Sequence, residues 1–297
     1  MEKVFNRSLQ QKLEDYITEV GSQNKAATNL GISATVLSMY RRSEYTGDIE
    51  SVEKRLTEML DNFAESKVLY KVGDYAPTSV SQGVYQTIRI CHLKGGLAVE
   101  AGDAGIGKTM AAKQYVKDYP NTAVYLAVNP CTSNVSPFLK SLAKALRIEI
   151  SGRKDDMWAR INDTLMGGKK VLIIDESQHL PIKTIETIRS FSDSNSELGV
   201  CLIGNLESLR NNGKGGYAQI RNRTKLTNTR HTSNITLDDI RLLFPEADKK
   251  CAEFLHKITQ TEQAVRGASN LYSNAADNQN TSYEGLVAMA RATKVLT

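Results

Sequence analysis

The segment at residues 102–109 constrains the fold of this chain more than any other. It reads GDAGIGKT and fits the pattern G-x-x-x-x-G-K-S/T. The apolar residues 96–101 before it predict a strand, and residues 108–119 after it have the composition of a helix. Glycines let the backbone close around a phosphate group with its N–H groups pointing inward, and the positive end of the following helix adds to the attraction. The segment therefore predicts a loop that binds the phosphates of a nucleotide; a glycine-rich turn without a ligand is the structural alternative.

Two residues of this segment have separate expected roles. Lys108 can reach the β- and γ-phosphates of ATP and serve catalysis there, and the Thr109 hydroxyl can ligate Mg²⁺. The whole loop and the first turn of the helix are expected to bind the cofactor. These residues are Gly102, Asp103, Ala104, Gly105, Ile106, Gly107, Lys108, Thr109 and Met110.

Polar side chains end two further apolar runs. The run VLIIDE ends in Asp175 and Glu176, and burying acids at the end of a strand is costly unless a cation lies nearby. Asp175 is therefore expected to hold the metal, and Glu176 to orient the attacking water. A later run, VCLIGN, ends in Asn205, whose amide could hydrogen-bond both that water and the γ-phosphate. The alternatives are a strand that simply emerges into solvent and an ordinary Gly-Asn turn.

Three kinds of sequence follow one another along the chain. Residues 1–66 and 233–297 have apolar residues at helical spacing, whereas residues 67–83 contain Gly, Pro and small polar residues typical of a linker. From about 84 to 232, short apolar runs alternate with helical stretches, which predicts an α/β core with a parallel sheet. The predicted strands of this core are residues 96–101, 122–128, 170–176 and 199–205.

Composition excludes several classes of protein. The 297 residues carry a net charge of +5, which permits a polyanionic partner without requiring one. The four cysteines lie far apart, so neither a disulfide framework nor a cysteine-based metal site is expected. No apolar run approaches the length of a membrane span, and the N-terminus has no apolar signal segment. We expect a protein of the bacterial host cytoplasm with no membrane partner.

Residues 22–42 have the pattern of a helix-turn-helix. Gly31 is the expected turn residue, because positive φ is easily adopted there, and Ser33 is the expected N-cap of the second helix. Residues 1–66 contain eleven acids against eight Lys and Arg, yet residues 22–42 contain three cations and no acid. A purely structural helical bundle or a protein-docking domain is the alternative to DNA binding. The residues expected to contact DNA are Thr35, Ser38, Arg41 and Arg42.

Basic residues also gather outside the N-terminal helices. Residues 207–231 contain six Lys and Arg and one acid. The loops at 151–154 and 167–170 are further candidates for contacting DNA, although a solvated loop would have the same composition. In the first of these loops the candidates are Arg153 and Lys154.

The order of these segments resembles that of an AAA+ ATPase. By that resemblance residues 102–109 are Walker A, Asp175 and Glu176 are Walker B, and Asn205 is sensor 1. The resemblance implies an AAA+ P-loop NTPase core, with ATP and Mg²⁺ as cofactors and ATP bound between subunits of a homo-oligomer. It also implies a catalytic arginine offered to the neighbouring subunit, either Arg221 or Arg223 in QIRNR, and a sensor 2 arginine, Arg266, in a small C-terminal helical lid.

A helix-turn-helix domain ahead of such a core is similar to the MuB-like family of transposition target-capture proteins, which is related to TnsC and IstB. That resemblance implies ATP-dependent, largely sequence-non-specific binding of double-stranded DNA and assembly as a ring or helical filament. It also implies delivery of the DNA to an integrase-type transposase. The rival interpretations are a helicase loader or replication initiator, a nucleotide-gated transcription regulator, and a structural or signalling ATPase with no role on DNA.

Overall fold

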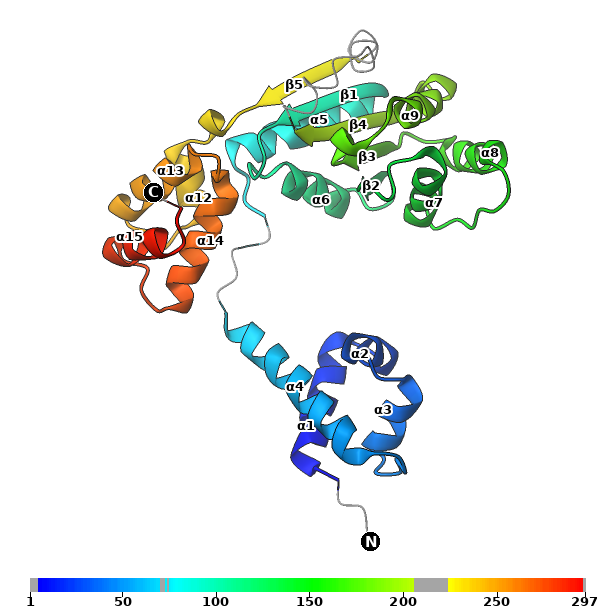
Figure 1. Ribbon diagram of the computed structural model, residues 1–297. Coiled ribbons are helices and arrows are strands. Elements are labelled where there is room, and N and C mark those ends of the chain that lie inside the picture. The colour runs from blue at the N-terminus through cyan, green and yellow to red at the C-terminus, as the bar shows by residue number, and fades with distance from the viewer. Residues whose placement is uncertain (1–4, 70–72, 74, 206–223, 296–297) are drawn as a thin grey trace. The chain divides into compact units, whose positions relative to one another are not determined.

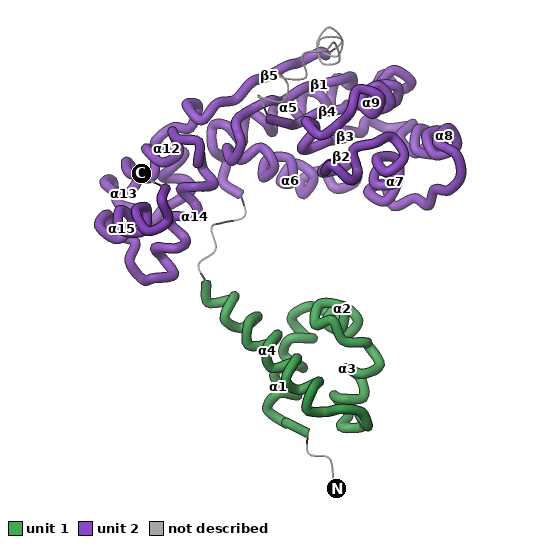
Figure 2. The backbone as a smooth tube through the Cα atoms, viewed as in Figure 1, with its two compact units in different colours: residues 1–71 green, residues 72–297 purple. Residues whose placement is uncertain are grey.

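The chain divides into two compact units, residues 1–71 and 72–297 (Figure 2). The computed structural model describes residues 5–69, 73, 75–205 and 224–295. In those ranges no helix has both the length and the apolar character that crossing a membrane requires.

The described part of the first unit contains four helices, which are labelled in Figure 1. They are α1 (Arg7–Val20), α2 (Gln23–Leu30), α3 (Ala34–Arg41) and α4 (Ile49–Val68). Apolar side chains at helical spacing meet in one core, in which Leu13, Leu37, Tyr40 and Leu56 are fully buried. Burying such side chains supplies the main favourable free energy for a small helical unit.

The turn between α2 and α3 confirms the predicted helix-turn-helix geometry. Gly31 has φ of 60°, and its N–H donates to the carbonyls of Ala27 and Thr28 at the end of α2. Ser33 caps α3, because its Oγ accepts a hydrogen bond from the backbone N–H of Val36 at 3.2 Å.

The second unit is built on a five-stranded parallel sheet with the order β2-β3-β4-β1-β5. The strands are β1 (Gly96–Gly102), β2 (Ala123–Ala127), β3 (Val171–Asp175), β4 (Gly199–Asn205) and β5 (Leu226–Arg230). The first four confirm the predicted parallel sheet. The sequence did not predict β5, because only Leu226 among its residues LTNTR is apolar. The five residues alternate between half-buried and exposed, as on the edge of a sheet.

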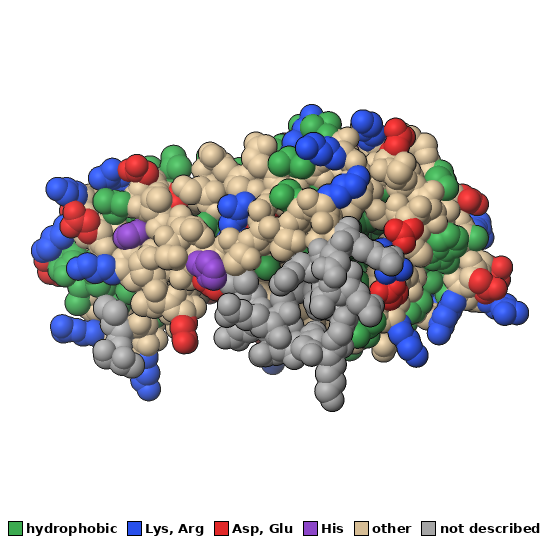
Figure 3. Space-filling model, turned by 90° about the horizontal axis from the view of Figure 1, so that it is seen from above, with side chains coloured by type: hydrophobic (Ala, Val, Ile, Leu, Met, Phe, Trp, Pro, Cys, Tyr) green, Lys and Arg blue, Asp and Glu red, His purple; other side chains and the backbone are tan. Residues whose placement is uncertain are grey.

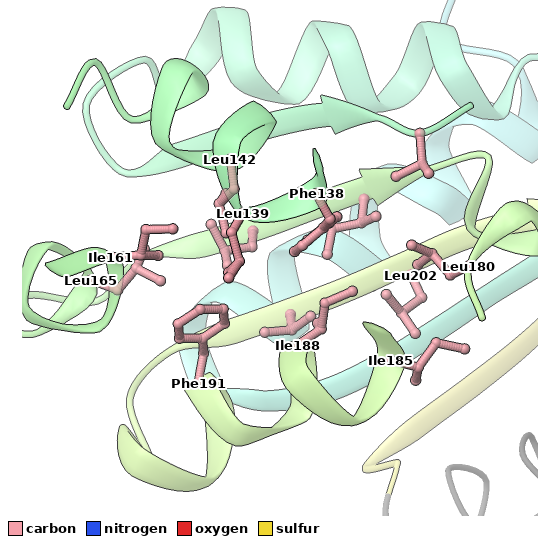
Figure 4. Close-up of a cluster of buried hydrophobic side chains, with 14 of the residues drawn as sticks. Phe138, Leu139, Leu142, Ile161, Leu165, Leu180, Ile185, Ile188, Phe191 and Leu202 are labelled. Carbon is pink, nitrogen blue, oxygen red and sulfur yellow. The ribbon is translucent and has the colours of Figure 1, made fainter. Parts of the chain in front are cut away.

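Helices cover both faces of the sheet. They are α5 (Ser79–Lys94), α6 (Lys108–Asp118), α7 (Val135–Ala145), α8 (Lys154–Leu165) and α9 (Ile182–Ser194). Phe138 and Leu139 of α7 pack with Ile188 and Phe191 of α9 over Leu202 of β4 (Figure 4). Successive residues of a strand face opposite sides of the sheet, so the Cα hydrogen of Gly199 that a side chain would replace lies on the other face from Leu202. Helix α5 packs closely there, and a Cβ on Gly199 would meet the Cys91 carbonyl oxygen at 2.5 Å.

Residues after β5 are helical, as predicted. A short 3₁₀ turn lies at Thr232–Asn234, directly after β5, and another lies earlier in the chain at Ser177–His179, between β3 and α9. The C-terminal helices are α12 (Leu237–Leu243), α13 (Lys249–Thr259), α14 (Ala264–Asp277) and α15 (Tyr283–Ala292). Asp239 of α12 joins these helices to the start of α5, since its Oδ1 accepts a hydrogen bond from the Ser79 N–H at 2.6 Å. Helix α5 thus begins inside residues 67–83, where the composition predicted a linker.

Candidate nucleotide-binding site

A pocket of about 570 Å³ lies where the carboxyl ends of the central strands meet. Strands β1, β3 and β4 are parallel neighbours, so the loops that follow them gather at one edge of the sheet. The lining residues come from these loops, from the start of α6 and from α14. They are Ala104, Gly105, Gly107, Lys108, Thr109, Met110, Asp175, Glu176, Gly204, Asn205, Val265, Arg266 and Ser269.

Among the residues that the structure describes, Lys108 is the one lysine lining this pocket, and only 8% of it is exposed. Its Nζ donates hydrogen bonds to the carbonyl oxygens of Gly102 at 2.9 Å and Asp103 at 2.6 Å. Burial lowers the pKa of Lys108, and the nearby carboxylates, Asp175 first among them, oppose that effect. The ammonium therefore sits among neutral carbonyls and acids, where a phosphate anion would be a strong partner.

The loop before Lys108 has the backbone form that an anion site needs. Gly105 and Gly107 have φ of 75° and 98°, a region that favours glycine. Gly107 caps α6 without a side-chain hydrogen bond, so the first N–H groups of this eleven-residue helix have no side-chain acceptor from the cap. The structure thus presents bare backbone donors and the positive end of a helix beside one ammonium.

Thr109 of α6 and Asp175 of β3 lie within hydrogen-bond distance of each other. The Thr109 Oγ1 donates to Asp175 Oδ2 at 2.7 Å, and the Glu176 N–H donates to Asp175 Oδ1 at 2.9 Å. A hydroxyl and a carboxylate that is 97% buried are hard oxygen donors, which fit Mg²⁺. Within the described ranges no group of three or more His, Cys, Asp or Glu side chains could hold a metal ion.

Glu176 is held by a residue that the sequence did not reveal. The Glu176 backbone lies in the left-handed region with φ of 56°, a conformation that costs a non-glycine residue on the order of 1–3 kcal/mol. The Gln178 amide donates to Glu176 Oε2 and accepts a hydrogen bond from the Asn205 N–H at 3.3 Å. Gln178 thus links the end of β3 to the end of β4.

The C-terminal helices close one side of the pocket. Arg266 lines the pocket, and its backbone N–H donates to the Gly105 carbonyl oxygen at 3.2 Å. A Cβ on Gly105 would meet the Arg266 Cβ at 3.2 Å, so glycine allows this close approach. Val265 and Ser269, which also line the pocket, were not predicted, because only a folded chain brings α14 to the phosphate loop.

Not every residue of the predicted loop faces this pocket. Ile106 is buried, and the Asp103 carboxylate turns toward the residues after β5, where it accepts a hydrogen bond from the Thr232 N–H at 2.8 Å. A smaller pocket of about 280 Å³ shares Gly107, Met110, Val265 and Ser269 with the first. Its other lining residues are largely apolar or small: Gly73, Tyr75, Ala76, Thr78, Ser81, Ile106 and Leu243.

The remaining predicted site residues that the structure describes line neither pocket. Arg221 and Arg223 lie outside the described residues. Arg153 and Lys154 are exposed at the start of α8, where Arg153 pairs with Asp155 at 3.4 Å. On the described part of the face shown in Figure 3, lysines and arginines are interspersed with acids.

The two arginines of the helix-turn-helix differ. Arg41 is bound within the first unit, because its guanidinium donates to both carboxylate oxygens of Glu14, at 2.5 and 2.6 Å, and to Gln23. This contact raises the pKa of Arg41. Arg42 is exposed at the end of α3, and α3 also carries an exposed Thr35 and a half-buried Ser38.

Solved structures with a similar fold are known. The ORC2 protein of Aeropyrum pernix in its ADP form matches with a TM-score of 0.55 at 13% identity, over 72% of this chain and 66% of that chain, slightly less than two thirds. The ORC1 protein of the same organism, in complex with DNA, matches with a TM-score of 0.50 at 14% identity, over 75% of this chain and 67% of that one. At such identities the similarity concerns the fold alone.

Sequence relatives extend over most of the chain. The AAA domain family matches residues 92–212. The Mu-like prophage FluMu DNA transposition protein B of Haemophilus influenzae is 26% identical over 273 residues, which are 88% of this chain and 94% of that protein. The ATP-dependent target DNA activator B of Escherichia phage Mu is 26% identical over 250 residues, covering 81% of this chain and 78% of that protein. The chain is therefore similar to B proteins of Mu-like phages over most of its length, and part of it matches the AAA domain family.

Proposed function

We propose that this chain is an ATP-dependent, largely sequence-non-specific DNA-binding ATPase. It assembles on double-stranded DNA and delivers that DNA to a transposase. One observation carries the ATPase part of the proposal: Lys108, the Thr109–Asp175 pair, Glu176 and Asn205 surround a single pocket at the carboxyl edge of the sheet. The relatives named transposition protein B and ATP-dependent target DNA activator B support the same role.

ATP would occupy the two adjoining pockets described above, of about 570 and 280 Å³. The polar pocket suits the triphosphate, because Lys108 can exchange its carbonyl partners for phosphate oxygens, and the N–H groups at the start of α6 can donate to the same oxygens. The smaller pocket suits the base, because its lining is largely apolar and it adjoins the first at Gly107 and Met110. Thr109 and Asp175 would hold Mg²⁺, which when bound neutralises charge on the phosphate oxygens.

Hydrolysis needs a positioned water more than covalent help from the protein. Glu176 would accept a hydrogen bond from that water and orient it, and the Asn205 amide would contact the γ-phosphate. The catalytic arginine of a neighbouring subunit would be Arg221 or Arg223, and Arg266 of α14 would respond to the nucleotide. ATP bound between subunits would then favour assembly, and loss of the γ-phosphate would weaken it.

DNA contact would combine many weak sites. Thr35 and Ser38 of α3, and Arg42 directly after it, would face phosphates along the duplex. Basic residues of the second unit, such as Arg153 and Lys154, would do the same. Each contact contributes little alone, but repeated subunits along one DNA molecule add their contributions through multivalency. Contacts to phosphates carry no sequence information, which accounts for the expected lack of sequence preference.

The test measures binding of the full chain to two DNA duplexes of unrelated sequence. Fluorescence anisotropy reports the affinity for each duplex with ATP, with ADP and without nucleotide. We expect ATP to be required and the two affinities to agree within a few-fold. We also expect Lys108→Ala to behave as wild type does without nucleotide. Equal binding in all three nucleotide conditions, or protection of one defined sequence, would contradict the proposal.

A second experiment addresses the partner. Co-purification of the ATP-bound chain with an integrase-type transposase, compared with a hexameric replicative helicase, separates target delivery from helicase loading. We expect the transposase to be retained and its strand transfer into bound DNA to increase. Retention of the helicase instead would favour a loader.

A further inference from the structure

Tyr125 contacts the carboxylate that is expected to hold the metal. It lies on β2, beside β3, where the strand register pairs Ala127 with Asp175. The Tyr125 hydroxyl donates a hydrogen bond to Asp175 Oδ2 at 2.9 Å. That oxygen also accepts the hydrogen bond from Thr109 at 2.7 Å, so two hydroxyl groups meet on one carboxylate oxygen.

The two carboxylate oxygens of Asp175 have different hydrogen-bond donors. Oδ1 accepts the Glu176 N–H, and Oδ2 accepts Thr109 and Tyr125. Asp175 is only 3% exposed, so bulk water has little access to replace a lost donor. If Thr109 turns its oxygen to a metal ion, Tyr125 is the side chain, among the residues that the structure describes, that still donates to Oδ2.

We propose that Tyr125 is a positioning residue for metal-dependent nucleotide binding, whose hydroxyl fixes the orientation in which Asp175 receives Mg²⁺–ATP. This inference rests on the proposed nucleotide-binding function. Residues that orient a ligand to a metal typically change metal affinity or activity by about 10- to 100-fold when they are removed.

The test uses Tyr125→Phe in the full chain, because this change removes one oxygen atom and keeps the ring. Binding of a non-hydrolysable fluorescent ATP analogue is measured with Mg²⁺ and with EDTA, and the gain in affinity due to the metal is compared with wild type. We expect this gain to fall about tenfold, with binding in EDTA unchanged. Tyr85→Phe is the matched control, because the Tyr85 hydroxyl donates to Asp118 at 2.8 Å outside both pockets.

The outcomes separate the two proposals. If wild type does not bind the analogue under either condition, the proposed function fails. If wild type gains affinity from Mg²⁺ and Tyr125→Phe gains as much, only the role of Tyr125 is overturned. The role of Tyr125 would also be overturned if the Tyr125→Phe chain unfolded, or if it lost as much affinity in EDTA as with Mg²⁺. Either result would indicate a role in folding. In an Asp175→Asn background, the role of Tyr125 predicts no further effect of Tyr125→Phe.

Discussion

The side-chain oxygen of Asn205 lies 3.4 Å from Lys108 Nζ, although 97 positions separate the two residues in the sequence. The sheet explains this proximity, because β1 and β4 are neighbours and their register pairs Gly102 with Asn205. The residue expected to bind the phosphates and the residue expected to contact the γ-phosphate therefore lie at the same edge.

This arrangement predicts different effects for the two side chains. Lys108→Ala should weaken ATP binding about 100-fold, because it removes the only ammonium that lines the pocket within the described residues. Asn205→Ala should leave ATP binding within a few-fold of wild type and lower kcat by about 100-fold, the typical cost of losing one donor to charge that develops in a reaction. Equilibrium binding and steady-state turnover of both variants test this. Equal loss of binding in the two would contradict it.

Gln178 is predicted to act through Glu176. Removing the amide in Gln178→Ala frees the Glu176 carboxylate and the Asn205 N–H that it now links. We expect kcat to fall about tenfold with ATP affinity unchanged, since mispositioning of a catalytic group affects turnover more than binding. His179→Ala is the control, because His179 is exposed on the same short turn. Similar turnover in both variants would show that Gln178 has no positioning role.

Arg41 and Arg42 are predicted to differ in what they stabilise. Arg41→Ala should lower the free energy of unfolding of the first unit by about 1 kcal/mol, because it breaks a partly exposed ion pair with Glu14. Arg42→Ala should leave stability unchanged and make the slope of log affinity for DNA against log salt shallower by about 0.9, as one phosphate contact is lost. Chemical denaturation and DNA binding at several salt concentrations measure both. An unchanged slope for Arg42→Ala would remove that residue from the DNA interface.

Arg230 is predicted to stabilise the buried carboxylate of Glu100. The Glu100 side chain is fully buried, and its Oε1 accepts from Arg230 Nε at 2.8 Å. Arg230→Met leaves this carboxylate without a cation and should lower the free energy of unfolding by about 3–5 kcal/mol. Adding Glu100→Leu should recover most of the loss, because no charge then remains buried. A double variant as unstable as Arg230→Met would contradict this account.

The sequence predicted what depends on local pattern. The strand, loop and helix around residues 102–109, the parallel sheet and the turn at Gly31 all follow from spacing, glycine conformation and short apolar runs. What depends on pairing between distant segments could not be predicted. Strand β5 lacks an apolar pattern, and Arg230, interpreted as part of a basic region, is paired with Glu100 inside the unit.

The same reason accounts for the missed site residues. Tyr125 and Gln178 reach the carboxylates only because β2, β3 and β4 lie side by side in a register that the sequence does not specify. Arg41 has the composition of a DNA contact, and only the packing of α1 against the rest of its unit reveals Glu14 as its partner.

Electron microscopy of the full chain with long duplex DNA tests the central claim most directly. Samples with ATP, with ADP and without nucleotide are compared, with Lys108→Ala as the control. We predict continuous protein coating along the DNA with ATP alone, and bare DNA in the other samples and in the variant. Equal coating with ADP or without nucleotide, or isolated particles at one site on the DNA, would contradict the claim that bound ATP joins subunits along the duplex.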